Sequence, residues 1–254
     1  MELTKYAHEC PAQFQQCSSI GHFRFPFRVF VSLSVAPHRL GALYDVLPNL
    51  CLPCVTAIVV NVPDTFRGQT YDEQSLVNLV KAFPHVWINR FGADLGPISK
   101  VLPTRKIADK RSDVIIAVDD DTLYESALIV RLCQEHMKYP NAIISNEGSF
   151  NIWNMRIRNV LGFTGVLYPS HLLSDDVVHT MLEYTNRWKA CRLHDDMTIT
   201  MALAKHNVEI RALFQNLRPC QVSAGLEDPM ALFRLTHSYW KHPACVWRIW
   251  GLLK

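Results

Sequence analysis

Three consecutive carboxylates, Asp119-Asp120-Asp121, follow directly on an apolar run at residues 115–118. A β-branched apolar run of this kind predicts a buried central strand of a mostly parallel sheet. Ligands of open α/β sheets bind beyond the carboxyl ends of such strands. Adjacent acids repel one another unless a positive charge lies among them, and oxygen ligands suit Mg²⁺ or Mn²⁺. Because these ions complete their coordination shells with substrate phosphates, the motif predicts a metal–diphosphate site.

The same acids could instead cap a helix expected to begin near Leu123, since aspartate is favoured at helix N-caps. One acid would be enough for a cap and three adjacent acids add repulsion, so the metal interpretation is favoured. Acid pairs after buried strands also serve phosphatases and receiver domains. If the strand continues through the motif, Asp119 and Asp121 point to one side of the sheet and Asp120 to the other. Two carboxylates on one side could share a cation and the ribose of a nucleotide.

A second acid pair, Asp195-Asp196, follows His194 and precedes a helical pattern at residues 197–206. A helix N-cap is again the structural alternative, but a capping acid can also be a catalytic one. A carboxylate close to a metal-bound donor could remove the proton of a sugar hydroxyl as a general base.

Two glycine-containing segments carry weaker signals. Residues 96–100 are Gly-Pro-Ile-Ser-Lys, and one interpretation is a turn that starts a helix with Lys100 in solvent. The alternative is a phosphate site in which the helix N-terminus and Lys100 both contact the phosphate. Residues 162–165, Gly-Phe-Thr-Gly, are on their own a flexible loop. With the acids upstream, this loop becomes a candidate for close backbone approach to a sugar.

The elements that must position these residues alternate between strand and helix up to residue 146. We predict strands at residues 28–35, 55–62, 86–89, 113–118 and 142–145, and helices at 40–47, 71–83, 96–106 and 123–137. Such an order predicts a parallel sheet with right-handed crossovers. The alternation then breaks down, with helices expected near 175–184 and after Asp196. We expect one domain, 1–254, with a donor half at about 28–145 and an acceptor half at about 146–254.

Composition sets limits on the function. The 254 residues are 49% hydrophobic and 19% charged, which predicts a sizeable core. A net charge of +3 without a basic run gives no support to a nucleic-acid or membrane-surface partner. No apolar stretch is long enough to cross a bilayer, and the first residues lack an apolar signal region. We expect a cytoplasmic protein without a membrane span, unless an anchor lies outside this chain, and it could be one module of a larger polypeptide.

The eight cysteines are scattered, and only Cys51 and Cys54 have the spacing of a metal or redox motif. No second pair follows at the distance of a zinc site. We therefore expect reduced thiols and no structural zinc.

Six segments across about residues 28–204 together resemble GT-A-fold nucleotide-sugar glycosyltransferases. They are VSLSVAPHRL, AIVVNVP, GPISKVLP, VDDDTLY, GFTGVLYP and HDDMTITMAL. The likeness is greatest to small inverting-type enzymes and to uncharacterised viral, algal and bacterial relatives. VDDDTLY is similar to the Asp-x-Asp metal motif of that fold, whereas HDDMTITMAL has two aspartates where the usual form is Glu-Asp. The implied fold is a Rossmann-like, central, mostly parallel sheet flanked by helices.

The resemblance implies a nucleotide-diphosphate sugar donor held through Mn²⁺ or Mg²⁺, and a hydroxyl of a glycan or glycoconjugate as acceptor. Carried over by position, Asp121 would ligate the metal, and Asp119 would reach the ribose, or the metal through water. Asp196 would be the base, or Asp195 if the register is one residue off. The remaining donor contacts would be Pro37 and Arg39 beside the nucleotide, Lys100 at a phosphate or ribose, Asp120, and Gly165 at the donor sugar. His237 and His242 lie where some members have a further metal ligand.

Several alternatives stay open on the sequence alone. An inverting mechanism with Asp196 as base is favoured, but retention in this fold needs no clear nucleophile signature. A sugar nucleotidyltransferase would usually carry a glycine-rich basic motif near its N-terminus, and none follows Val35. A non-catalytic sugar-binding module is the third alternative, although intact acids in both motifs argue against a decayed site.

Overall fold

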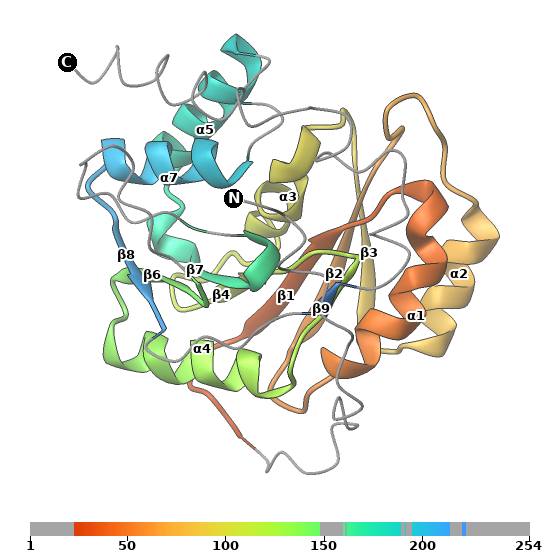
Figure 1. The fold of residues 1–254 in the computed structure, drawn as a ribbon, viewed down its shortest axis with the longest axis horizontal. Coiled ribbons are helices and arrows are strands. Elements are labelled where there is room, and N and C mark those ends of the chain that lie inside the picture. The colour runs from red at the N-terminus through yellow and green to blue at the C-terminus, as the bar shows by residue number, and fades with distance from the viewer. Residues whose placement is uncertain are drawn as a thin grey trace.

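A seven-stranded mixed sheet forms the centre of the described part of the chain (Figure 1). The structure is a computed structural model, and it describes residues 23–147, 160, 162–188, 191, 195–213 and 220–221. The strand order is β3-β2-β1-β4-β7-β6-β8. The strands are β1 (Val29–Ser34), β2 (Ala57–Pro63), β3 (Val86–Phe91), β4 (Val114–Ala117), β6 (Ala142–Ser145), β7 (Val166–Pro169) and β8 (Glu209–Ala212).

The first four strands form the parallel half that the sequence predicts. β1 pairs with both β2 and β4, and β2 pairs with β3, all in parallel. Short helical segments connect them: η3 (Pro37–Ala42), α1 (Leu43–Val46), η4 (Leu47–Asn49), α2 (Glu73–Ala82), η5 (Gly96–Lys100) and α3 (Leu102–Arg105). The helix expected at 96–106 is thus a 3₁₀ turn followed by a short α-helix. Proline at the start of both pieces fits because a missing N–H costs nothing in a first turn.

The second half of the sheet contains one antiparallel strand, β7, which was not predicted from the sequence. β7 pairs antiparallel with β4 and with β6, while β6 and β8 are parallel. The register Ala117↔Val166 places the start of β7 beside the end of β4. Residues 162–165, which lead into β7, therefore lie at the edge where the acid motif leaves β4. A second, two-stranded sheet pairs β5 (Thr122–Leu123) with β9 (Cys220–Gln221).

Helices cover both faces of the large sheet, as expected for an α/β fold. One hydrophobic layer joins alternate β1 residues to buried side chains of α1, α2 and α4 (Ala127–Lys138). The other layer joins Phe30 and Ile115 to α3, α5 (Asp175–Arg187) and α7 (Asp195–Lys205). Side chains alternate in direction along each strand, so two layers of core form from one set of strands. Figure 1 shows α5 and α7 together over the β7 and β8 end of the sheet.

The oxidation state of the cysteines differs from the prediction that all of them are reduced. Cys51, Cys54 and Cys133 are free, but Cys191 is disulfide-bonded. Sequence spacing could not reveal this because a disulfide depends on which cysteines the fold brings together. Within the described residues, no helix combines the length and apolar character that crossing a bilayer requires.

Candidate functional site

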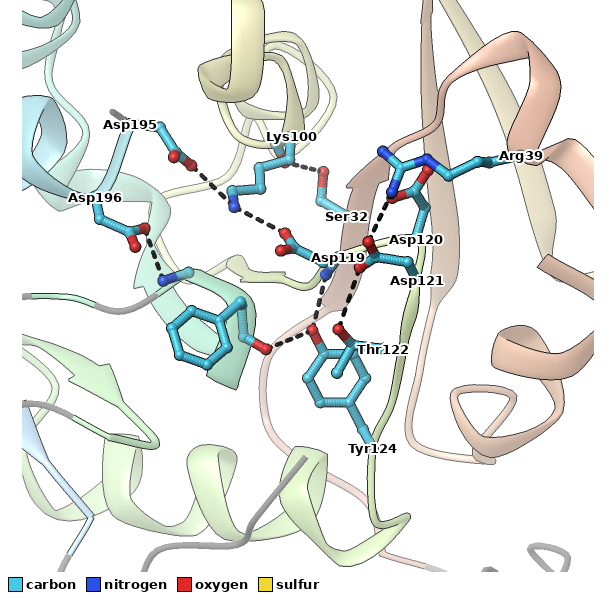
Figure 2. Close-up of polar contacts among 12 residues, drawn as sticks. Ser32, Arg39, Lys100, Asp119, Asp120, Asp121, Thr122, Tyr124, Asp195 and Asp196 are labelled. Atoms are coloured by element: carbon cyan, nitrogen blue, oxygen red, sulfur yellow. Dashed lines mark hydrogen bonds and ion pairs between the residues drawn. The ribbon is translucent and has the colours of Figure 1, made fainter. Parts of the chain in front are cut away.

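The Asp119-Asp120-Asp121 motif lies beyond the carboxyl end of β4 and does not cap a helix. The next helix, α4, begins at Ala127 with Ser126 as its N-cap residue. The backbone N–H of Asp119 instead donates to the hydroxyl of Tyr124 at 2.8 Å, and that hydroxyl donates to the carbonyl of Phe163 at 2.9 Å. Tyr124 thus ties the acid motif to the 162–165 loop (Figure 2).

Arg39 holds two of the three acids. Its Nη1 lies 2.7 Å from Oδ2 of Asp121 and 3.2 Å from Oδ1 of Asp120. The backbone N–H of Ala36 also donates to Oδ2 of Asp120, at 3.3 Å. Burial raises the pKa of Asp120 to about 7, although the Arg39 charge acts in the opposite direction. Both Arg39 and Ala36 come from the segment after β1, next to Pro37, which begins η3.

This pairing corrects the expectation that Asp119 and Asp121 share one side. β4 ends at Ala117, so the strand alternation does not continue into the motif. Asp120 and Asp121 meet the same guanidinium, while Asp119 turns to Lys100.

Lys100 joins the two acid motifs. Its Nζ lies 2.9 Å from Oδ1 of Asp119 and 2.9 Å from Oδ2 of Asp195 (Figure 2). The lysine side chain is only 7% exposed, and its carbonyl accepts from the hydroxyl of Ser32 on β1 at 2.5 Å. Burial works against the ammonium charge, but the attraction of Asp119, Asp195 and the neighbouring Asp196 outweighs it and raises the pKa of Lys100 well above its usual range. The alternative of a solvated lysine is therefore wrong.

Asp196 lies in the first turn of α7, beside Asp195. Its Oδ1 accepts a hydrogen bond from the backbone N–H of Gly162 at 2.8 Å. Burial, reinforced by the negative charge of Asp195, raises the pKa of Asp196 to about 8. A carboxyl group with a pKa near neutral pH can both accept and release a proton under ordinary conditions, as general acid–base catalysis requires.

The two glycines of the 162–165 loop are required for different reasons. A Cβ on Gly162 would lie 2.6 Å from Nζ of Lys100 and 2.7 Å from Oδ1 of Asp196. Gly165 has a φ of +98°, and a Cβ there would lie 2.8 Å from Leu128 of α4. Backbone conformation and packing thus explain Gly165, and its contact with a donor sugar stays a prediction.

The fold therefore gathers most of the residues that the sequence singled out. Arg39 pairs with Asp120 and Asp121, and Lys100 pairs with Asp119 and Asp195, all near the edge of the sheet where β4 ends. Pro37 and Gly165 lie in the segments that border these two groups. The contributions of Tyr124, Gly162 and Ser32 were not predicted. Tyr124 could have been predicted as a site residue because it belongs to VDDDTLY. The sequence around Ser32 indicates only a strand and gives no sign of a role in the site. His237 and His242, the positions expected for a further metal ligand, lie outside the described residues, as does His194.

The acid cluster has the donor chemistry of a magnesium or manganese site. Asp119 and Asp121 offer only oxygen ligands, and the carboxylate of Asp119 is 29% exposed. Among the described residues, no group of three or more His, Cys, Asp or Glu side chains surrounds a common point. Mg²⁺ sites commonly use one or two protein carboxylates, with waters and substrate phosphates as the remaining ligands.

No family model and no curated protein sequence matches the chain. Solved structures do. S. aureus TarS 1–349 in complex with UDP-GlcNAc superimposes with a TM-score of 0.59 over 88% of this chain, at 12% sequence identity. The chain has a GT-A fold. S. aureus TarS in complex with UDP gives a TM-score of 0.53 at 12% identity over 87% of this chain, and TarS 1–349 gives 0.53 at 14% over 78%.

These matches confirm the predicted fold class, with the sheet mixed and mostly parallel. The chain spans less than two thirds of TarS 1–349, since the matches cover 61% to 65% of that protein.

Proposed function

We propose that this protein is a glycosyltransferase that moves a sugar from a nucleotide-diphosphate sugar to a hydroxyl of a glycan or glycoconjugate. The observation that carries the proposal is the meeting of two acid motifs, through Lys100, beyond the end of β4. Open α/β sheets bind their ligands at this edge. The fold of TarS, which was solved with UDP-GlcNAc, favours a UDP-sugar as the donor here.

The donor would lie between the segment after β1 and the acid motif. Pro37 and Arg39 would border the nucleotide, and Asp120 would help to hold Arg39 in place. Asp121 would ligate Mn²⁺ or Mg²⁺, and Asp119 would reach the ribose, or the metal through water. The metal, when bound, supplies Lewis-acid stabilisation of the charge on the leaving diphosphate. Arg39 adds a second positive charge beside Asp121.

Asp196 is the residue we propose as the base. Asp195 is bound to Lys100, whereas Asp196 is oriented by one backbone N–H and has a raised pKa. The acceptor oxygen would attack the anomeric carbon as its proton passes to the carboxylate of Asp196. The bond between that carbon and the diphosphate oxygen breaks, and the nucleoside diphosphate leaves with the electron pair. A single in-line displacement of this kind inverts the anomeric centre.

A panel of nucleotide sugars tests the proposal. We expect one UDP-sugar to raise the unfolding temperature of the protein, and to do so only with Mn²⁺ or Mg²⁺ present. Asp121→Ala should remove this metal-dependent shift and abolish transfer, while Asp109→Ala, a change at an exposed acid that pairs with Arg28, should keep both.

Product analysis then tests the chemistry. NMR of the anomeric proton distinguishes inversion from retention. Absence of a thermal shift with every nucleotide sugar, or an active Asp121→Ala variant, would contradict the proposed site.

A further inference from the structure

We propose that Lys100 is a positioning residue that couples donor binding at Asp119 to the acceptor-side acids of α7. This inference rests on the proposed function. When the metal–donor complex binds Asp119, the ammonium group is left to Asp195 and holds the start of α7 more firmly.

The geometry gives Lys100 two competing partners. Its Nζ is 2.9 Å from a carboxylate oxygen of Asp119 and equally far from one of Asp195. These acids belong to segments on either side of the site, the end of β4 and the start of α7. The lysine ammonium is a single positive charge between two carboxylates. If the negative charge of one carboxylate is reduced, the ammonium is drawn more strongly towards the other.

The two partners are not equally open to a ligand. The side chain of Asp119 is 29% exposed, that of Asp195 is 13% exposed, and that of Lys100 is 7% exposed. A cation from solvent would therefore reach Asp119 first. Sharing the charge of Asp119 with a divalent cation weakens its hold on Lys100. The position of Lys100 then shifts in favour of Asp195.

The surroundings of the ammonium group limit where it can move. Gly162 approaches so closely that even a methyl group on it would lie 2.6 Å from Nζ. Behind the side chain, the Lys100 carbonyl is fixed to β1 by the hydroxyl of Ser32, which also bonds to the Thr104 hydroxyl at 2.6 Å. The ammonium can therefore shift between Asp119 and Asp195 while its backbone stays anchored. Low exposure keeps water from screening the pair.

A binding cycle tests the coupling without measuring turnover. The dissociation constant of UDP with Mn²⁺ is measured by calorimetry for the wild type, Asp195→Asn, Lys100→Met and the double variant. Asp195→Asn removes one of the two ion pairs of Lys100, so the lysine is held more strongly at Asp119, where it competes with the metal, although Asp196 still attracts it. We expect Kd to rise about 5- to 50-fold. In the Lys100→Met background the same change should alter Kd less than about twofold, because no lysine competes.

Asp175→Asn is the matched control. Asp175 also lies in the first turn of a helix, α5, and pairs with Arg105 at 3.2 Å, but it is 97% exposed. Its removal should leave the Kd of UDP unchanged. If Asp195→Asn and Asp175→Asn bind UDP with the same Kd, the proposed coupling is wrong, but the proposed donor site is not contradicted. If the wild type binds no UDP with Mn²⁺, the proposed function fails, and the coupling fails with it.

Hydrogen exchange of the wild type gives a second readout, which does not depend on the folding of a lysine variant. Adding UDP and Mn²⁺ should slow amide exchange in the first turns of α7, although this helix belongs to the acceptor side. Exchange in α5 should stay the same. Unchanged exchange in α7 at saturating UDP would contradict the proposal.

Discussion

The backbone N–H of Gly162 donates to Oδ1 of Asp196 across 2.8 Å, and the missing side chain of this glycine leaves the space that the carboxylate occupies. The same space holds the ammonium of Lys100. One residue without a Cβ therefore lets a carboxylate and an ammonium group lie together against the loop that leads into β7.

Gly162→Ala should impair turnover more than stability. The added methyl group would displace the carboxylate of Asp196 or the ammonium of Lys100, and an ångström of displacement can cost about 100-fold in rate. We expect kcat to fall about 10- to 100-fold in steady-state kinetics with a UDP-sugar. Gly41→Ala is the control, since a Cβ there has nothing within 4 Å. Equal loss in both variants would show that the close approach has no catalytic consequence.

Asp196→Asn should separate catalysis from donor binding. The amide keeps the shape of the side chain but cannot accept the acceptor's proton, and a general base is typically worth about 10²- to 10⁴-fold in rate. We expect kcat to drop within that range, while the Kd of UDP with Mn²⁺ changes little. Calorimetry and initial rates on the same preparation check both parts. A variant with wild-type turnover would assign the base to another residue.

The pH profile should follow the raised pKa of Asp196. Burial and the charge of Asp195 bring this pKa to about 8, and only the deprotonated carboxylate can act as a base. We therefore expect kcat/KM to rise with pH and to level off above about 8. Asp195→Asn removes the repelling charge and should move the rise towards acid. A flat profile between about pH 5 and 9 would contradict this role.

The same raised pKa has a consequence for stability. A carboxyl group that binds its proton more tightly in the folded state than in the unfolded one stabilises the fold at low pH. That contribution is complete below the usual pKa of 3.8 and is lost as the pH rises through about 8. In denaturant titrations, the unfolding free energies of wild type and Asp196→Asn should be most alike at the acid end of this window and differ most above about pH 8, where the wild type carries the buried charge.

Tyr124→Phe should destabilise the protein. The hydroxyl of Tyr124 accepts from the N–H of Asp119 and donates to the carbonyl of Phe163, so its removal leaves two backbone groups without this partner. A buried polar group that loses its partner costs about 1–3 kcal/mol of unfolding free energy. Tyr44→Phe, at a tyrosine that is 44% exposed, should cost less than about 0.5 kcal/mol in the same urea titration.

The sequence identified the residue types of the site better than their contacts. Local patterns were enough for the parallel strands β1 to β4, because apolar runs, prolines and helical spacing alternate clearly there. β7 was missed because its four residues follow a glycine loop and carry no signal for strand direction. The partners of Lys100 were equally hidden, since Asp119 and Asp195 come from distant segments. The pairing of Arg39 with both Asp120 and Asp121 was also hidden, because it depends on β4 ending before the acids.

The register of the antiparallel pairing between β7 and β4 fixes the position of the 162–165 loop relative to the acid motif. Leu167 packs into one hydrophobic layer and Tyr168 into the other, so a slip of one residue would turn both side chains the wrong way. The cost of exchanging the two core layers thus protects the alignment of the 162–165 loop with the acid motif. Lengthening the chain between Gly165 and Val166 by one residue would be far more damaging than lengthening the exposed turn at Gly68, where nothing lies within 4 Å of an added Cβ.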